Sequence, residues 1–158
     1  MKKCIVTGGA GFIGSHLVDL LLYKKYKVIV IDNLSGGRIE NLKHHKKNKR
    51  LVLNKIDINK INKSNKVFNN IDYVFHLAGI GDIVPSIEDP SKYMMTNIQG
   101  TVNILEAARY YGVKKFIYAA SSSCYGINNK RTAEDQKTDP QYPYALSKYL
   151  GEQSTSLA

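Results

Sequence analysis

The sequence is poor in cysteine and in acidic residues, and it lacks any long apolar run. Cys4 and Cys124 are its only cysteines, so cysteines alone form neither a disulfide framework nor a zinc site. We interpret both as buried or site-flanking thiols of a reducing compartment. No run reaches the ~18 apolar residues of a membrane span. Polar residues interrupt the apolar stretch after Met1-Lys2-Lys3, so this start does not have the continuous apolar region of a signal peptide. We therefore expect a cytoplasmic protein with no membrane partner.

The shortage of acidic residues is regional. The chain has 13 Asp and Glu against 23 Lys and Arg, and residues 38–66 hold ten of the basic residues but only Glu40 and Asp57 as acids. This interval contains no Phe, Tyr or Trp on which nucleic-acid bases could stack. We interpret it as a solvated surface, in preference to the alternative of a nucleic-acid-binding patch. We therefore expect no nucleic-acid partner.

Length and composition favour one globular domain over residues 1–158. With 43% hydrophobic and 23% charged residues, the chain is neither disordered nor collagen-like, and it shows no internal repeat or linker. Short apolar runs predict strands over residues 4–6, 28–31, 51–53, 73–77 and 116–119. Helical patterns cover residues 12–22, 93–111 and 144–155 and, more weakly, 59–69. This alternation predicts an α/β fold with a doubly wound, Rossmann-like parallel sheet.

The expected helices carry apolar stripes that would face the sheet. The stripe of the first helix is Phe12, Ile13, Leu17, Leu20 and Leu21, and that of the long helix is Ile98, Val102, Leu105 and Ala108. Gly112 is placed to end the long helix, and Pro143 suits the first turn of the last one.

A glycine-rich loop lies between the first strand and the first helix. Gly8, Gly11 and Gly14 have the spacing GxxGxxG. A dinucleotide fingerprint requires a strand before such a loop and a helix directly after it, and both are expected here. Gly8 would permit the tight turn, Gly11 the approach of a pyrophosphate, and Gly14 the close packing of helix on strand. The alternative is a glycine-rich turn without function. With a strand, a helix and a downstream acid all in place, we expect a dinucleotide site.

The downstream acid is Asp32, at the end of the second strand. A carboxylate there accepts hydrogen bonds from the adenosine ribose hydroxyls and repels a 2′-phosphate, so it favours NAD over NADP. Arg38 nearby is the feature that speaks for NADP, and a simple strand-end cap is the other interpretation of Asp32. Asp57-Ile58 follows the third strand, where such folds flank the adenine, although any polar turn would look the same.

A tyrosine and a lysine have the spacing of a catalytic pair. Tyr144 and Lys148 are at i and i+4, on one face of a helix. A nearby cation stabilises phenolate and lowers the tyrosine pKa, so the pair can act as a general base. The run Ser121-Ser122-Ser123 follows the fifth strand, where a hydroxyl could hold a substrate oxygen, or where it could simply be a polar turn.

Taken together, these motifs resemble the extended short-chain dehydrogenase/reductases, in the NAD-dependent epimerase/dehydratase branch, and most closely the UDP-glucose and UDP-N-acetylglucosamine 4-epimerases. The resemblance covers the whole chain and rests on residues 8–14, 32–34, 76–79, Asn97, 121–126 and 144–148. It implies a nucleotide-sugar 4-epimerase that transfers hydride between C4 of a UDP-hexose and NAD through a 4-keto sugar.

The resemblance also implies site residues. Tyr144 would be the base, Lys148 its pKa-lowering partner, and Ser121 the catalytic hydroxyl, with Ser86, Ser122 and Ser123 as substrate-binding residues and no metal. The implied NAD-binding residues are Gly8, Gly11, Phe12, Ile13, Gly14, Asp32, Asn33, Asp57, Ile58, Leu77, Ala78, Gly79, Asn97, Tyr144 and Lys148. Family 4,6-dehydratases carry Thr-Asp-Glu where this chain has three serines, which disfavours dehydration.

Members of the family are roughly twice as long and hold most of the nucleotide sugar in a C-terminal part. We therefore expect the cofactor-binding portion only, either a fragment or a natural truncation. The alternative functions are a non-catalytic dinucleotide-binding module and another nucleotide-sugar dehydrogenase, reductase, dehydratase or decarboxylase of the same family. The fifth strand would lack a neighbour, and an unpaired edge favours self-association. We expect a homodimer, with UDP-hexose as the partner of the longer form.

Overall fold

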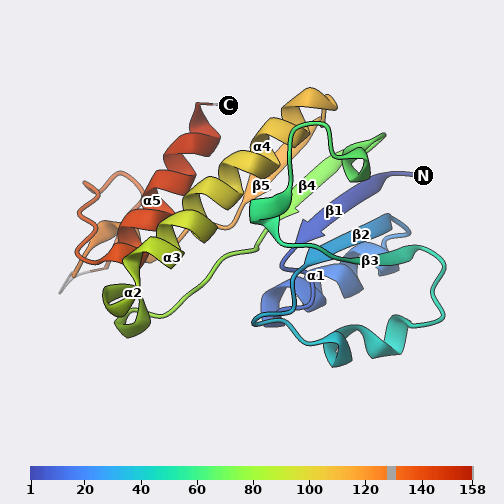
Figure 1. The fold of residues 1–158 in the computed structure, drawn as a ribbon, viewed down its shortest axis with the longest axis horizontal. Helices are drawn as coiled ribbons and strands as arrows, with labels where there is room; N and C mark the ends of the chain where they lie inside the picture. Colours follow the sequence, from blue (N-terminus) through green and yellow to red (C-terminus); the bar gives the residue numbers. More distant parts are fainter. Residues whose placement is uncertain (128–130, 158) are drawn as a thin grey trace.

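Five parallel strands form one sheet in the order β3-β2-β1-β4-β5 (Figure 1). The computed structural model describes residues 1–127 and 131–157. The strands are Lys3–Thr7 (β1), Lys27–Asp32 (β2), Leu51–Lys55 (β3), Tyr73–His76 (β4) and Lys115–Tyr118 (β5). The chain winds outward from β1 to β3 and then returns to β4 on the other side of β1. The doubly wound Rossmann-like sheet is thus confirmed, and its strand order reverses between β1 and β4.

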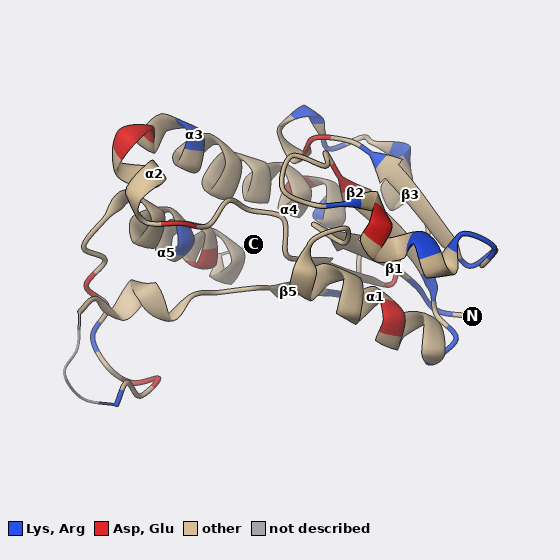
Figure 2. Ribbon diagram, turned by 90° about the horizontal axis from the view of Figure 1, so that it is seen from below, with Lys and Arg blue, Asp and Glu red and all other residues tan. Residues whose placement is uncertain are grey.

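Helices cover both faces of the sheet (Figures 1 and 2). The α-helices are Phe12–Tyr23 (α1), Val84–Glu88 (α2), Pro90–Met94 (α3), Gly100–Tyr110 (α4) and Pro143–Ser156 (α5). A π-helical turn, Met95–Gln99 (η4), joins α3 to α4, and 3₁₀ turns occur at Ile39–His45 (η1), Ile58–Lys60 (η2), Lys66–Phe68 (η3) and Ser122–Tyr125 (η5). None of the helices in residues 1–127 and 131–157 has the length and apolar character to cross a membrane.

The central strand β1 is buried because it is covered on both faces. Val6 packs in a core cluster with Val18 of α1, whereas its neighbour Ile5 packs with Ile104 of α4 on the other face. Cys4 belongs to the α1 side, and Cys124 is buried as well, so the prediction of two buried thiols is confirmed.

The weak helix expected over residues 59–69 is wrong. The structure has two separate 3₁₀ turns there, η2 and η3. The Asp57 side chain accepts the N–H of Asn59, and the Asn65 side chain accepts the N–H of Val67. Each of these short polar side chains starts a new turn locally, and such bonds compete with a continuous helix.

The expected stripe of α1 is partly wrong. Phe12 and Ile13 are 79% and 70% exposed and Leu20 is half exposed, whereas the buried face consists of Gly14, Ser15, Val18, Leu21 and Leu22. The close contact of Gly14 with the strand-to-helix turn sets this face, because only a residue without a side chain fits there.

The long helix is continuous, but its buried face is displaced by one residue from the prediction. Leu105 and Ala108 are buried as expected, whereas Ile98 and Val102 are only half-buried. Other buried positions are Asn97, Thr101, Ile104 and Ala107. The π turn η4, which contains Asn97, shifts the phase of the helix ahead of Thr101.

Both predicted helix boundaries are confirmed. Gly112 has φ +66°, its N–H donates to the carbonyl of Arg109, and the N–H of Val113 donates to that of Ala108. This pair of bonds is the Schellman pattern that ends a helix. Pro143 is the first residue of α5.

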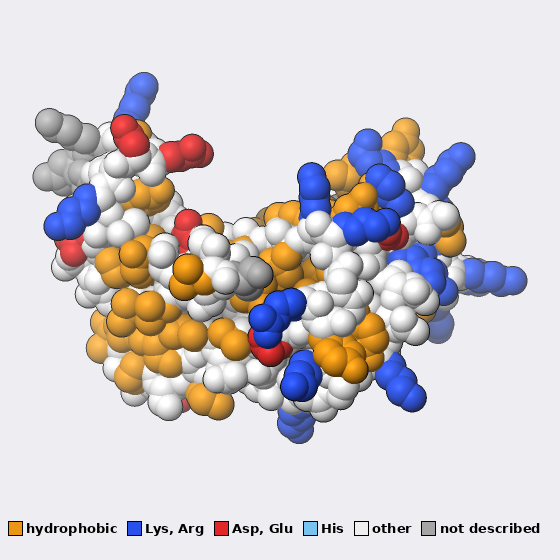
Figure 3. Space-filling view, turned by 90° about the horizontal axis from the view of Figure 1, so that it is seen from above, with side chains coloured by type: hydrophobic (Ala, Val, Ile, Leu, Met, Phe, Trp, Pro, Cys, Tyr) orange, Lys and Arg blue, Asp and Glu red, His pale blue; other side chains and the backbone are white. Residues whose placement is uncertain are grey.

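The two edges of the sheet, at β3 and at β5, differ in charge and in how well they are covered by other parts of the chain. Lys and Arg residues gather at the end of the molecule that carries β3 and the N-terminus (Figure 2), and their side chains cluster at that end in the space-filling view (Figure 3). At the opposite edge, β5 pairs with β4 alone among the described strands. Its residues Lys115 and Ile117 are exposed, so this edge and one face of β5 remain largely uncovered.

Candidate active site

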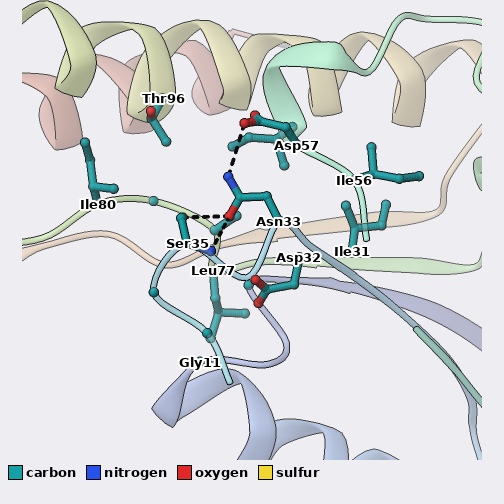
Figure 4. Close-up of a pocket in the computed structure, with 16 residues that line it drawn as sticks. Gly11, Ile31, Asp32, Asn33, Ser35, Ile56, Asp57, Leu77, Ile80 and Thr96 are labelled. Carbon is teal, nitrogen blue, oxygen red and sulfur yellow. Dashed lines mark hydrogen bonds between the residues drawn. The ribbon is translucent and has the colours of Figure 1, made fainter. Parts of the chain in front are cut away.

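A cavity of about 270 Å³ lies at the carboxyl ends of β1, β2, β3 and β4 (Figure 4). Ligands of open α/β sheets bind at this place, beside the point where the strand order reverses. The predicted cofactor residues that line the cavity are Gly8, Gly11, Asp32, Asn33, Asp57, Ile58, Leu77, Ala78 and Gly79. The structure therefore brings four separate segments of the sequence together around one cavity.

The turn after β1 accepts only glycine at its two ends. Gly8 has φ +66°, and a Cβ there would lie 2.8 Å from the backbone N of Ala78. A Cβ on Gly14 would lie 2.1 Å from the carbonyl oxygen of Gly8. Because Gly8 and Gly14 have no side chains, the backbone of the turn packs closely against the end of the strand and the start of the helix.

The N-terminus of α1 is suited to a phosphate group. Its N-cap, Gly11, offers no side-chain cap, and the first turn carries no acid. The first N–H groups of a helix have no partner within the helix, so those of Phe12, Ile13 and Gly14 are available as donors. Together with the positive end of the helix dipole, they form an anion-binding site whose ligand contacts backbone, not the exposed side chains of Phe12 and Ile13.

Asp32 lines the cavity and caps the local backbone at the same time. Asp32 is only 7% exposed. Its Oδ2 accepts the N–H of Ala10 at 2.9 Å, and its Oδ1 accepts the N–H of Leu34 at 2.8 Å. A carboxylate has about four lone-pair sites, so each oxygen retains one for a ligand hydroxyl. Gly37 lies so close that its Cβ would be 2.8 Å from Oδ2. The interpretation of Asp32 as a cap at the end of the strand is thus confirmed, and its contact with an adenosine ribose stays a prediction.

Asn33 and Asp57 join the ends of β2 and β3. Nδ2 of Asn33 donates to Oδ2 of Asp57 at 3.1 Å, and Oδ1 of Asn33 accepts the N–H of Ser35 at 3.0 Å (Figure 4). The backbone N–H of Asn59 and further donors hold the pKa of Asp57 below its usual value despite partial burial. Beside this polar pair, Ile56 and Ile58 provide an apolar wall.

Asn97 does not line this cavity but positions its wall. The residue is 2% exposed. Its Oδ1 accepts the N–H of Ile80 at 2.9 Å, and its Nδ2 lies 3.0 Å from the carbonyl of Ile80 and 2.9 Å from Oγ of Ser147. Asn97 thus fixes the segment after β4 against α5, the helix that carries the predicted catalytic pair.

The predicted catalytic residues lie at the end of β5 and in the first turns of α5. Nζ of Lys148 donates to the carbonyl of Ala119 at 2.6 Å and lies 4.3 Å from the centre of the Tyr118 ring. Burial lowers the pKa of Lys148 to about 8. Ser121 follows Ala119 by two residues and caps η5, where its Oγ accepts the N–H of Ser123 at 3.2 Å. None of the three lines the 270 Å³ cavity.

A second hollow, of about 430 Å³, leads from that cavity toward Tyr144. The two share Gly36, Gly79 and Ile80. The second is also lined by the buried Tyr93, whose hydroxyl donates to the carbonyl of Gly81 at 2.5 Å. The ring centre of Tyr93 lies 6.3 Å from that of Tyr144. Tyr93 therefore lies next to both the second hollow and the ring of the predicted base.

The predicted substrate residues are placed in different ways. Ser86 is fully buried in α2, and its hydroxyl donates to the carbonyl of Ile83 at 2.6 Å. Ser122 is exposed and Ser123 is half-buried. Their contacts with a substrate stay predictions.

Sequence reasoning missed several cavity residues. Those that line the 270 Å³ cavity without having been predicted are Ile31, Ser35, Gly36, Gly37, Ile56, Ile80 and Thr96. The pair Gly36-Gly37, shortly after Asp32, was a visible signal for a close approach of backbone to a ligand.

The sheet order, the glycine turn and the acid at the end of β2 define a dinucleotide-binding type of α/β domain. Residues 4–157 match the model of the NAD-dependent epimerase/dehydratase family. The chain belongs to this family.

Individual proteins similar to this chain, in sequence and in structure, include epimerases and a dehydratase. The chain is 38% identical over 156 residues to a putative UDP-glucose 4-epimerase of Methanocaldococcus jannaschii, with 97% of the chain and 50% of that protein covered. It is 37% identical to a UDP-N-acetylglucosamine 4-epimerase from Methanobrevibacter ruminantium (TM-score 0.92; 99% of this chain and 50% of that one). It is 32% identical to a dTDP-glucose 4,6-dehydratase from Streptomyces venezuelae solved with NAD (TM-score 0.90; 96% and 50%). The chain thus spans about half the length of these relatives.

Proposed function

We propose that the chain is the cofactor-binding and base-bearing part of an NAD-dependent UDP-hexose 4-epimerase. The observation that carries this proposal is the position of Asp32, nearly buried beside the glycine turn and lining the cavity at the strand ends. Epimerases are among the relatives that match this chain along nearly the whole of its 158 residues.

The residues present fit NAD. The diphosphate would lie at the N-terminus of α1, where three backbone N–H groups are available, and the adenosine ribose would lie at Asp32. The adenine would lie between the Asn33–Asp57 pair and Ile58, and the nicotinamide ribose would contact Lys148. NAD, when bound, supplies the acceptor and then the donor of the hydride at C4 of the sugar.

The chain's own residues would move the proton. With a pKa of about 8, Lys148 is mostly an ammonium ion at pH 7. Held at the end of β5 by Ala119, it would favour the phenolate of Tyr144, one turn earlier on α5. Tyr144 would accept the proton of the sugar 4-hydroxyl, and the Ser121 hydroxyl would orient that oxygen. After the 4-keto sugar has turned over, Tyr144 would return the same proton to the sugar 4-oxygen, which restores both the hydroxyl and the phenolate.

Among the functions open to the family, the run Ser121-Ser122-Ser123 favours epimerisation, because it offers no acid to drive loss of water. Dehydrogenase, reductase and decarboxylase activity remain the second candidates, since they need the same cofactor and base. A cytoplasmic location and a homodimer stay predictions.

We expect the chain to bind NAD more tightly than NADP, because Asp32 is an acceptor for ribose hydroxyls and would repel a 2′-phosphate. Asp32→Ala should weaken NAD about 10- to 100-fold, the worth of one or two hydrogen bonds to a charged group, and should also relax the preference. Calorimetric titration of both dinucleotides measures this.

Asp32→Asn is the matched variant, since its amide oxygen can still accept a backbone N–H while the charge is gone. It should relax the preference at a smaller cost in fold stability. Tighter binding of NADP than of NAD by the parent chain would overturn the assignment.

We further expect the 158-residue chain alone to bind NAD but to interconvert UDP-glucose and UDP-galactose at a negligible rate. Binding energy from the nucleotide part of the substrate is needed to orient the sugar, and we place those contacts in the half of the relatives' length that is not matched here. Coupled assay of both sugars tests this. Robust turnover by the 158-residue chain would show that the substrate binds elsewhere than proposed, while leaving the NAD assignment intact.

A further inference from the structure

Two histidines and an aspartate converge on the outer side of α1, away from the cavity-lining residues. Nε2 of His44 lies 2.9 Å and Nε2 of His45 lies 2.7 Å from the same oxygen, Oδ1 of Asp19. The histidine ring centres are 4.2 Å apart. Asp19 comes from the middle of α1, and both histidines come from the end of η1.

This convergence has the dimensions of a metal-ligand set. The three ligating atoms lie within 4.8 Å of one another. Zinc binds histidine nitrogen and carboxylate oxygen at about 2.0 to 2.2 Å, which separates neighbouring ligands of a tetrahedral ion by about 3.4 Å. Asp19 and His44 have side chains that are 40% and 53% exposed, so small rotations can open the required space. His45, at 19%, is the more rigid member.

The chemistry of the donors favours a transition metal over magnesium or calcium. Two imidazole nitrogens and one carboxylate oxygen suit zinc, whereas the alkaline-earth ions prefer sets made of oxygen alone. Three protein ligands leave one position of a tetrahedral ion for water or an anion. Nearby Lys43, Lys46 and Lys47 reduce the attraction for a cation and favour an anion at the open position.

We propose that Asp19, His44 and His45 form a zinc-binding site that joins α1 to η1. The expectation of no metal came from the scarcity of cysteine and from the family resemblance. Neither could show this cluster, because its three residues come together only in the fold. With one carboxylate in a basic setting, the site should bind zinc with a Kd on the order of micromolar, weaker than a closed structural site.

Such a site would fix a segment that borders the NAD cavity. At its start, the N–H of Arg38 donates to the carbonyl of Ala10 at 2.9 Å, and Nδ2 of Asn41 donates to the same oxygen at 2.8 Å. The metal would hold its other end, at His44 and His45. Residues 35–37 line the cavity immediately before this segment.

The test is calorimetric titration of ZnCl₂ into the tag-free 158-residue chain, with CoCl₂ as a spectroscopic probe and MgCl₂ as a negative control. We expect one equivalent of zinc, visible absorption from bound Co²⁺, no magnesium binding, and a rise in Tm with zinc. Asp19→Asn and His45→Gln should each weaken the affinity for zinc about 100-fold. The loss of a residue that only supports a metal ligand costs about 10- to 100-fold, and the loss of a ligand itself should cost at least the upper value.

His16→Gln is the matched control, because His16 is an exposed histidine of α1 outside the cluster. It should retain the affinity of the parent. Circular dichroism of each variant without metal checks that it is folded. Absence of zinc binding by the parent, undiminished binding by folded Asp19→Asn and His45→Gln, or an equal loss in His16→Gln would each overturn the site. NAD binding is measured separately, so failure of the zinc site leaves the proposed function untouched.

Discussion

Tyr144→Phe should lower turnover roughly 10²- to 10⁴-fold in a form of the protein extended to the length of its relatives, the usual worth of general acid–base help. The change removes the proton acceptor but keeps the ring, so the contact with Tyr93 and the packing of α5 should persist. Steady-state rates with UDP-glucose measure the effect, and an unchanged circular dichroism spectrum and Tm serve as the control for folding.

Lys148→Ala should lower turnover as well, for two reasons. It removes the positive charge that would stabilise a phenolate on α5, and it removes the proposed contact with the nicotinamide ribose. The deficit should shrink as the pH is raised, because a phenolate then forms without a neighbouring cation. A double variant should fall little below the worse single one, because members of one proton relay are not additive.

Profiles of rate against pH for the four proteins decide the matter. Turnover of Tyr144→Phe within twofold of the parent would exclude Tyr144 as the base. The spacing of Tyr144 and Lys148 would then be a coincidence of the helix surface.

The sequence was informative where one residue type satisfies a backbone requirement. Gly8 needs positive φ and Gly14 permits no Cβ, so their spacing predicted the loop before its surroundings were known. The inner strands β1, β2 and β4 were predicted from the sequence just as directly, because cover on both faces makes them nearly continuous apolar runs. Parallel strands bring their carboxyl ends to one edge, which is why Asp32 and Asp57 could be placed together.

The remainder depended on contacts between distant segments. Residues 59–69 have a helical pattern, yet the side chains of Asp57 and Asn65 divide them into two turns. Tyr93 became part of the site through a bond to the carbonyl of Gly81, which no periodicity reports. Asp19 and His44 are 25 residues apart, and only the packing of η1 on α1 joins them.

Acidification should destabilise the fold through His76, which is fully buried at the end of β4. The Thr101 hydroxyl donates to the carbonyl of Asn97 at 2.7 Å, so it must accept the Nε2–H of His76 at 3.0 Å. Nδ1 of His76 is then the acceptor for the Thr7 hydroxyl at 2.7 Å. Both partners thus select the neutral ring, and burial lowers the pKa of His76 to about 3.

The direction of the pH effect follows from this lowered pKa. Unfolded histidine titrates near 6.5, so between that pH and about 3 the unfolded chain binds one more proton at this position than the native chain does. The contribution of His76 to the free energy of unfolding is therefore complete above about pH 6.5, and it falls by about 1.4 kcal/mol per pH unit below it. Urea unfolding at a series of pH values from about 6.5 to about 4.5 gives this slope.

His76→Leu isolates the contribution. The variant should be less stable at neutral pH, because the hydroxyls of Thr7 and Thr101 lose their partner, but its stability should decline less steeply with acid, by about 1.4 kcal/mol per pH unit. Equal slopes in parent and variant would mean that His76 takes up its proton in the folded state without difficulty. The Thr7 oxygen also accepts the N–H groups of Leu77 and Ala78, which line the NAD cavity. Protonation of His76 would therefore loosen the wall of the cavity together with the core of the sheet.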